Sequence, residues 1–370
     1  MVIEPVYLGS FLIFGGKMEK YINKILVLAL VGLLLFTSCA GKDSADKKSE
    51  ETTTETTKTT QNKPDDNSEK TQNSENNYYP VTIKNYNHAK EPIEMVFEKA
   101  PERVYSVNPT SVDNMLALGL EDKIVKISLG SPDRLTEEGK KLYEKLEGQE
   151  DTLTKEEVLG NNIDFILGWY STFDDKSLGE VDYWHDKGIN TYIALNSSVK
   201  KPEPNTLEDE YEDIRNLGKI FNVEDRAEKI INDMEEKIAM AQEKVKEHGK
   251  TKTIILEVEK DNQLRLYGPE TIGGVIAEKV GADLLTNEPR ITAEELIALN
   301  PDVIFTVHFG PGTNLGPDDA ISKVVDNKAF QSISAVENAR VYPIILTYTY
   351  APGVRAVEAI DYISEKLYEK

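Results

Sequence analysis

Aromatic and charged side chains that suit the binding of a small molecule gather where predicted strands end. The aromatic rings offer flat apolar surface, and the hydroxyl groups of tyrosine, the imidazole of histidine and the guanidinium of arginine supply hydrogen bonds or charge. Such a set fits a bulky planar or chelated ligand. The candidate ligand-binding residues are Trp169, Tyr170, Tyr267, His308, Tyr348, Tyr350 and Arg355. No catalytic residue and no resident metal site is expected among them.

Two segments of the chain match each other in sequence. Residues 154–170 (TKEEVLGNNIDFILGWY) align without a gap with residues 292–308 (TAEELIALNPDVIFTVH). Each begins with Thr-x-x-Glu, the pattern of a helix capping box, and each ends in a predicted strand. The match indicates two similar halves, each presenting a helix followed by a strand.

One acidic residue in each matching segment is not needed for the capping box. Glu156 and Glu294 occupy the same position in the two copies. The positive end of a helix dipole alone favours a glutamate there. Because one stands in each half, the pair also suits docking onto a partner with two-fold symmetry, and we take both as candidate docking residues.

The elements that must position these residues alternate between strands and helices. Strands are predicted at 103–107, 123–127, 163–169, 190–195, 253–258, 303–309 and 341–346, and helices at 111–118, 156–159, 178–185, 272–280, 292–299 and from 353 onward. This alternation predicts two α/β lobes with mainly parallel sheets. Ligands of open α/β sheets bind beyond the carboxyl ends of the strands, so we expect one cleft between the lobes.

A long helix is predicted between the lobes. Its apolar stripe consists of Ala227, Ile230, Ile231, Met234, Ile238, Ala241 and Val245, at the spacing of one helix face. With Asp225 near its start and Gly249 after its end, it would run for about twenty residues, or roughly 30 Å. A single rigid connection of this kind predicts limited opening and closing of the cleft.

The N-terminus has the features of a lipoprotein signal peptide. Lysines precede an apolar run at residues 25–36, and Cys39, the single cysteine of the chain, follows Thr37 and Ser38. The run is shorter than the ~20 residues of a membrane-spanning helix. We expect translation to start at Met18, and the mature chain to be anchored by lipid on Cys39 to the outer face of the cell membrane.

Composition then divides the rest of the chain. Residues 40–77 are polar and charged and predict a disordered tether. We expect an N-terminal lobe at 78–205, a hinge helix region at 206–249 and a C-terminal lobe at 250–370. The net charge of −22 argues against nucleic acid as a partner, and a monomer is expected.

The folded part resembles the helix-hinged solute-binding proteins of ABC importers, which serve iron–siderophore, haem and cobalamin uptake. The resemblance rests on several segments: 100–104 (APERV), 113–120 (DNMLALGL), 188–190 (GIN), the linking helix, 292–302 and 352–355 (PGVR). Asp113 stands where the family usually has Glu. The resemblance implies two lobes bridged by one helix, a ligand between them, and Glu156 and Glu294 pairing with arginines of a membrane permease.

The identity of the ligand stays open in the sequence. A ferric-siderophore chelate is favoured, with cobalamin and haem as alternatives; the tyrosines would ligate iron or stack on a macrocycle. No cluster of arginines marks a site for a catecholate or carboxylate ligand. A direct zinc or manganese receptor would need converging ligands, whereas His88, His185, His248 and His308 stand in unrelated contexts. A secreted hydrolase lacks a recognisable motif, and an adhesin would not explain two matched lobes.

Overall fold

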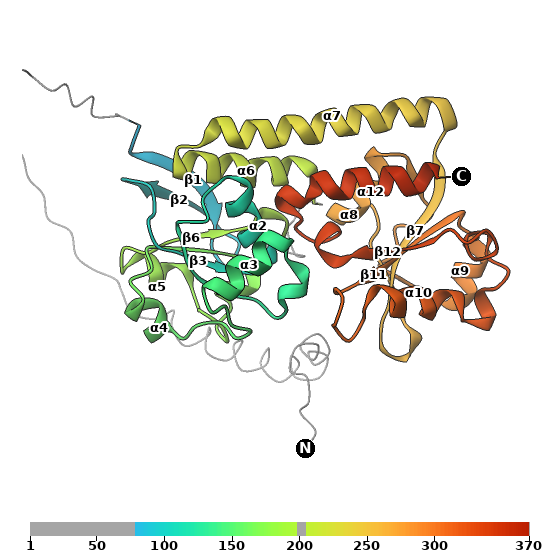
Figure 1. Cartoon of the computed structure of the whole chain (residues 1–370), viewed down its shortest axis with the longest axis horizontal. Coiled ribbons are helices and arrows are strands. Elements are labelled where there is room, and N and C mark those ends of the chain that lie inside the picture. The colour runs from blue at the N-terminus through green and yellow to red at the C-terminus, as the bar shows by residue number, and fades with distance from the viewer. Residues whose placement is uncertain (1–77, 198–204, 370) are drawn as a thin grey trace, which may run out of the picture. The chain divides into compact units, whose positions relative to one another are not determined.

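The computed structural model describes residues 78–197 and 205–369 (Figure 1). The predicted signal peptide with Cys39, and the predicted tether at 40–77, lie outside the described residues. Within the described part, no helix is both long enough and apolar enough to cross a membrane.

The first lobe is built on a four-stranded parallel sheet. Its strands have the order β4-β3-β5-β6, with bounds β3 (Val104–Val107), β4 (Ile124–Ser128), β5 (Phe165–Gly168) and β6 (Asn190–Ile193). Every residue of β3 and β5 is buried, as expected for central parallel strands covered on both faces. The helices of this lobe are α2 (Pro109–Ala117), α3 (Glu137–Lys145), α4 (Lys155–Gly160) and α5 (Val181–His185).

An antiparallel hairpin that the sequence analysis did not predict precedes this sheet. Strand β1 (Val81–Tyr86) pairs with β2 (Pro92–Phe97). Ile83, Met95 and Phe97 point into the core and are almost fully buried. The alternation of buried and exposed residues in both strands is that of a sheet with one solvated face.

The second lobe contains a mixed six-stranded sheet. Its order is β10-β8-β7-β11-β12, and β9 also pairs with β7; the bounds are β7 (Thr251–Val258), β8 (Leu264–Leu266), β9 (Ala282–Leu284), β10 (Arg290–Ile291), β11 (Val303–His308) and β12 (Val341–Ile345). Strands β7, β11 and β12 are parallel, as predicted, and β8 and β10 add an antiparallel edge. The helices are α8 (Ile272–Lys279), α9 (Ala293–Leu299), α10 (Pro317–Val325), α11 (Ser334–Glu337) and α12 (Ala356–Tyr368).

The matching segments fold alike, which confirms the predicted helix–strand units. In the first lobe α4 leads to β5, and in the second α9 leads to β11. Both helices carry complete capping boxes: the Thr154 and Thr292 hydroxyls accept from the backbone N–H groups of Glu157 and Glu295, whose side chains accept in return from the threonine N–H groups.

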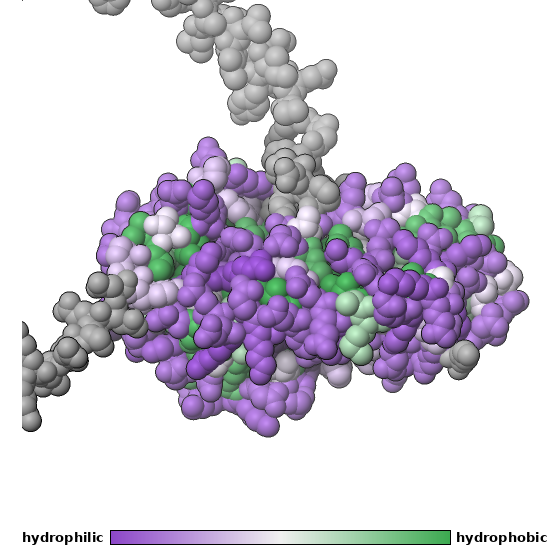
Figure 2. All heavy atoms as spheres, turned by 90° about the horizontal axis from the view of Figure 1, so that it is seen from above, coloured by the Kyte–Doolittle hydropathy of each residue, from purple (hydrophilic) through white to green (hydrophobic). Residues whose placement is uncertain are grey.

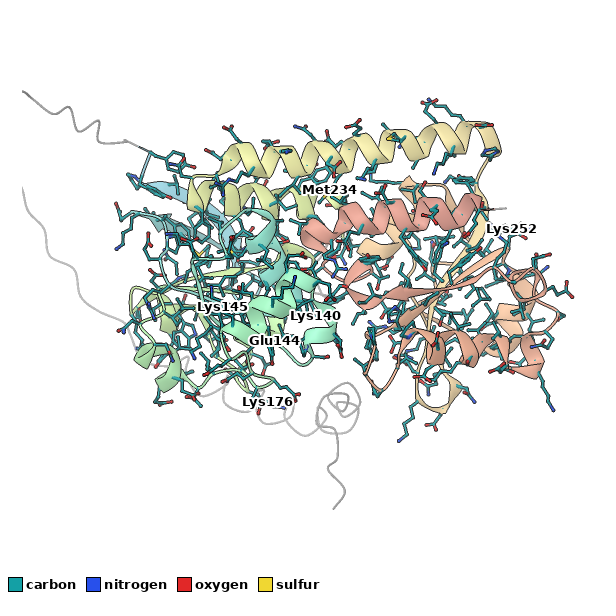
Figure 3. The ribbon with its side chains drawn as sticks, in the orientation of Figure 1. Lys140, Glu144, Lys145, Lys176, Met234 and Lys252 are labelled. Atoms are coloured by element: carbon teal, nitrogen blue, oxygen red, sulfur yellow. The ribbon has the colours of Figure 1, made fainter. Side chains whose placement is uncertain are left out.

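Helix α7 (Glu224–His248) connects the lobes, as the apolar stripe predicted (Figure 1). It packs against α6 (Leu207–Phe221), which lies within the predicted hinge helix region at 206–249, and against α12 of the second lobe. Met234, labelled in Figure 3, is fully buried on it. The helix ends at Gly249, whose φ of 78° suits glycine.

The core runs without a break from one lobe to the other. A single apolar cluster contains Phe165 of β5, Met234 of α7 and Phe305 of β11. Hydrophilic residues cover most of the opposite face of α7, which Figure 2 views from above, with the exposed Met240 as an exception. The linking helix is therefore part of the packed core rather than a free tether.

Candidate functional site at the lobe interface

Two of the predicted ligand-binding residues meet across the lobes. Trp169 directly follows β5 of the first lobe, and Tyr350 lies in the turn after β12 of the second. Their ring centroids are 5.2 Å apart at an interplanar angle of 78°, an edge-to-face arrangement that aromatic pairs favour. The Tyr350 hydroxyl donates to the carbonyl oxygen of Ser197 at 2.6 Å. The carboxyl ends of the two sheets thus face each other, as expected.

The turn that carries Tyr350 continues into a tight contact with α2. The Thr110 hydroxyl donates to the Ala351 carbonyl at 2.6 Å, and the Val354 N–H donates to Asn114 Oδ1 at 2.9 Å. Gly353, with φ 57°, lies so close to α2 that a Cβ would stand 2.2 Å from Asn114 Oδ1. The sequence motif Pro-Gly-Val-Arg therefore positions this turn against the first lobe.

Arg355 is held by carboxylates rather than left open to solvent. Its guanidinium lies 3.5 Å from Asp113 of the first lobe and 2.7 Å from Glu358. Burial lowers the pKa of Arg355, but Glu358 and Asp113 outweigh burial and raise it overall. For the Asp113 carboxyl, burial has the opposite sign and raises the pKa, and the charge of Arg355 offsets part of that rise. The position that resembles the family's Glu thus bridges the lobes through an ion pair.

Tyr348 belongs to the same network. Its hydroxyl donates to Glu358 at 2.8 Å, and the Arg355 guanidinium lies 5.2 Å from its ring centroid. Burial, followed by the charge of Glu358, raises the pKa of Tyr348 to about 12. In the metal-free protein this phenol therefore stays protonated at neutral pH.

Two other predicted tyrosines hydrogen-bond within their own lobes. Tyr267 is almost fully buried and donates to the Glu257 carboxylate at 2.8 Å; burial and that carboxylate hold its pKa far above the ordinary value. Tyr170 donates to the carbonyl of His88 at 2.7 Å, and its ring stacks on the His88 ring at 4.3 Å. The structure thus places Tyr170 against the turn between β1 and β2.

His308 ends β11 and points into a loop that reaches the first lobe. It is 8% exposed, and its Nδ1 accepts from the Gly310 N–H at 3.1 Å. Burial lowers the pKa of His308 and so favours its neutral form. A Cβ at Gly310, where φ is 116°, would stand 3.2 Å from Asp133 of the first lobe.

Two residues at this interface, Arg134 and Asn108, were not predicted from the sequence. Arg134 of the first lobe donates from Nε to the Phe309 carbonyl at 3.3 Å, and its guanidinium lies over the Phe309 ring at 5.5 Å. Asn108 follows β3 and caps α2, with its Oδ1 accepting from the Ser111 N–H at 2.9 Å. The predicted switch from strand to helix at Asn108-Pro109 could have indicated Asn108. Arg134 stands in an ordinary polar stretch of the sequence, so no local signal pointed to it.

The predicted docking residues are exposed and lie in different lobes. Glu156 stands in the first turn of α4 and Glu294 in the first turn of α9. Neither takes part in the capping boxes, which use Glu157 and Glu295. In Figure 1, α4 and α9 lie in separate lobes, below α7.

The histidines lie apart from one another. His88 stacks on Tyr170, His185 is 3.0 Å from Thr191, His248 lies near Tyr368, and only His308 is at the lobe interface. Within residues 78–197 and 205–369, no three His, Cys, Asp or Glu side chains are grouped so as to hold a metal ion.

A separate cavity of about 590 Å³ lies between α6, α7 and α8.

Comparison with known proteins decides the family. A family model described as "Periplasmic binding protein" matches residues 104–344, which span both lobes. The chain belongs to the periplasmic binding protein family. Members of this family are binding proteins rather than enzymes, and they work with the permeases of ABC transporters. The family resemblance seen in the sequence is thereby confirmed.

Individual members of the periplasmic binding protein family show the extent of the similarity. The uncharacterized ABC transporter substrate-binding lipoprotein YvrC of Bacillus subtilis is 26% identical over 297 residues, covering 78% of this chain and 86% of YvrC. The petrobactin-binding protein YclQ of the same organism is 25% identical over 148 residues, covering 38% of this chain and 45% of YclQ. The crystal structure of a periplasmic binding protein from Veillonella parvula is 32% identical, with a TM-score of 0.71, covering 78% of this chain and 92% of that one.

Proposed function

We propose that this protein is the substrate-binding lipoprotein of an ABC importer, which captures a ferric-siderophore-type chelate between its lobes and delivers it to a membrane permease. The observation that carries the proposal is the contact of Trp169 with Tyr350, because it unites the carboxyl ends of both sheets in one aromatic site. YclQ, which is named for petrobactin, supports an iron chelate as cargo. Cobalamin and haem are the alternative ligands within the same family.

The tyrosines contribute surface rather than metal bonds in this proposal. Each of Tyr170, Tyr267, Tyr348 and Tyr350 donates its hydroxyl proton to a protein acceptor. Iron would therefore arrive already coordinated by its chelator, and the protein would recognise the outside of the chelate. Lipid on Cys39 would hold the receptor at the outer face of the cell membrane, with residues 40–77 as its tether.

Ligand binding is tested with the processed chain carrying Cys39→Ser, to keep it soluble. We expect a ferric chelate to raise the midpoint of thermal unfolding, since a ligand that binds only the folded state stabilises it. Haem and cyanocobalamin form the other arms of the screen. If only haem or only cobalamin stabilises the protein, that ligand takes the place of the ferric chelate as the proposed cargo. If no ligand changes the unfolding midpoint, the proposed function is contradicted.

Docking on the permease is proposed to use Glu156 and Glu294. Replacing both by lysine should abolish chelate uptake by cells, because the lysines would repel the permease arginines with which the glutamates are proposed to pair. The affinity of the purified protein for its ligand should not change. Matched reversals at the exposed Glu121 and Glu247 should leave uptake intact; equal loss of uptake in this control would contradict a specific docking role.

A further inference from the structure

Three buried hydrogen-bond donors at the lobe interface have no partner among the described residues. They are Asn108 Nδ2, Trp169 Nε1 and Thr347 Oγ1. Asn108 is 6% exposed and Thr347 is 3% exposed, so both side chains lie largely out of contact with bulk solvent. A buried donor without an acceptor is costly, and each such donor in a native protein calls for an explanation, of which a bound ligand is one.

The three donors lie just beyond the carboxyl ends of strands. Ser106 of β3 pairs with Leu167 of β5, so Asn108 and Trp169, each two residues further on, follow the carboxyl ends of neighbouring strands. Thr347 follows β12, whose Ile345 pairs with His308. Trp169 touches Tyr350, three residues beyond Thr347. These are the sheet edges at which α/β proteins bind ligands.

The Asn108 amide is fixed in orientation. Its Oδ1 accepts both the N–H and the hydroxyl of Ser111, at 2.9 and 3.0 Å, which leaves Nδ2 as the free donor. Its φ of 108° is a left-handed value that a non-glycine residue rarely adopts. Backbone strain of this kind is concentrated at ligand sites.

A cation without a counter-charge lies at the same interface. Arg134 is half-buried, and no carboxylate of the described residues lies within ion-pair distance of its guanidinium, which donates to the Phe309 carbonyl. Arg355, in contrast, is neutralised by Asp113 and Glu358. Burial lowers the pKa of Arg134, in keeping with a partly buried charge that has no carboxylate beside it. Arg134 is thus a positive charge available to a ligand within a chain of net charge −22.

We propose that the interface recognises an anionic, oxygen-rich chelate through Asn108, Trp169 and Thr347, which donate to its oxygens, and Arg134, which balances its negative charge. The inference rests on the proposed function and narrows it from chelates in general to catecholate or carboxylate chelates. A neutral hydroxamate chelate would leave Arg134 without a counter-charge. The sequence did not reveal this specificity because the donors are three different residue types from three separate strand ends.

The first test removes one donor and keeps the ring. Trp169→Phe should weaken the binding of ferric tris-catecholate or ferric citrate on the order of tenfold, as expected for losing one hydrogen bond to a charged group. Trp184→Phe is the matched control, because Trp184 Nε1 is also buried and unpartnered but lies in the core of the first lobe. It should leave the affinity unchanged. Calorimetric titration of the full processed chain measures both, and circular dichroism verifies the fold.

Two further variants keep the test decisive should Trp169→Phe unfold. Thr347→Val removes a hydroxyl at nearly constant volume and should weaken binding to a similar extent. Arg134→Gln should weaken the anionic chelates more than a neutral ferric tris-hydroxamate. Arg340→Gln is its control, because Arg340 also donates to backbone carbonyls, those of Lys366 and Leu367.

The outcomes separate the inference from the proposed function. Binding of an anionic chelate with losses at Trp169, Thr347 and Arg134 but not at the controls supports the inference. Preferred binding of neutral hydroxamate, haem or cobalamin, or equal losses at controls, overturns the inference and leaves a receptor with a different specificity. Binding of none of these probes overturns the proposed function and the inference with it.

Discussion

The tyrosines of the candidate site share one property: their hydroxyl protons are already donated inside the protein. Tyr348 donates to Glu358, Tyr267 to Glu257 and Tyr350 to the Ser197 carbonyl. Burial is the first cause of the raised pKa in each case. The sequence correctly placed aromatic residues at strand ends, but the partner of each hydroxyl depends on tertiary contacts that residue spacing does not encode.

The raised tyrosine pKa values predict a loss of stability in alkali. An unfolded tyrosine ionises near pH 10, whereas these folded tyrosines keep their protons to higher pH. Above pH 10 the native state therefore binds more protons than the unfolded state, and the free energy of unfolding falls as pH rises. Tyrosinate absorbance should appear together with the loss of helical circular dichroism. Complete ionisation of the tyrosines near pH 10 with the fold intact would contradict the assigned burial.

Gly353 provides a test of the contact between the turn and α2. Gly353→Ala should lower the free energy of unfolding by about 2 kcal/mol or more, because it adds a clash with Asn114 to a strained φ. Gly188→Ala is the control: Gly188 has φ 72° but nothing within 4 Å of an added Cβ, so it should cost only about 1 kcal/mol. Urea unfolding measures both, and equal costs would refute the tight contact.

At the level of elements, local signals were the most informative. The capping boxes at Thr154 and Thr292 formed as predicted because each involves residues within one turn. The helix α7 was predictable because its stripe has a strict period. The β1–β2 hairpin was not predicted, and α6 was not distinguished from the linking helix within the region 206–249. Both gain stability from packing on other elements: Tyr79, just before β1, donates to the Ile220 carbonyl of α6.

The buried face of α7 should be sensitive to truncation. Met234→Ala should lower the free energy of unfolding by about 2–5 kcal/mol, since it leaves a cavity in the core that both lobes share. Met240→Ala, on the same helix but 63% exposed, should change it by no more than about 0.5 kcal/mol. A small effect at Met234 in chemical unfolding would contradict a core continuous through α7.

For the whole molecule, the linking helix and the continuous core argue against wide opening. The lobes are joined by α7, by the shared apolar cluster and by the Asp113–Arg355 ion pair. We expect ligand binding to be accompanied by a small closing movement only. X-ray scattering profiles of the free and ligand-bound protein should nearly superimpose. A large decrease in radius of gyration on binding would contradict this rigid connection.

The proposed site holds a small-molecule chelate between the lobes, against Trp169. The most direct test is fluorescence titration of the processed chain carrying Trp184→Phe, in which Trp169 is the one remaining tryptophan of the sequence. Saturable quenching by a ferric chelate, at the same midpoint as calorimetric binding, is the predicted result. Calorimetric binding without any change in Trp169 fluorescence would place the ligand elsewhere and contradict the account.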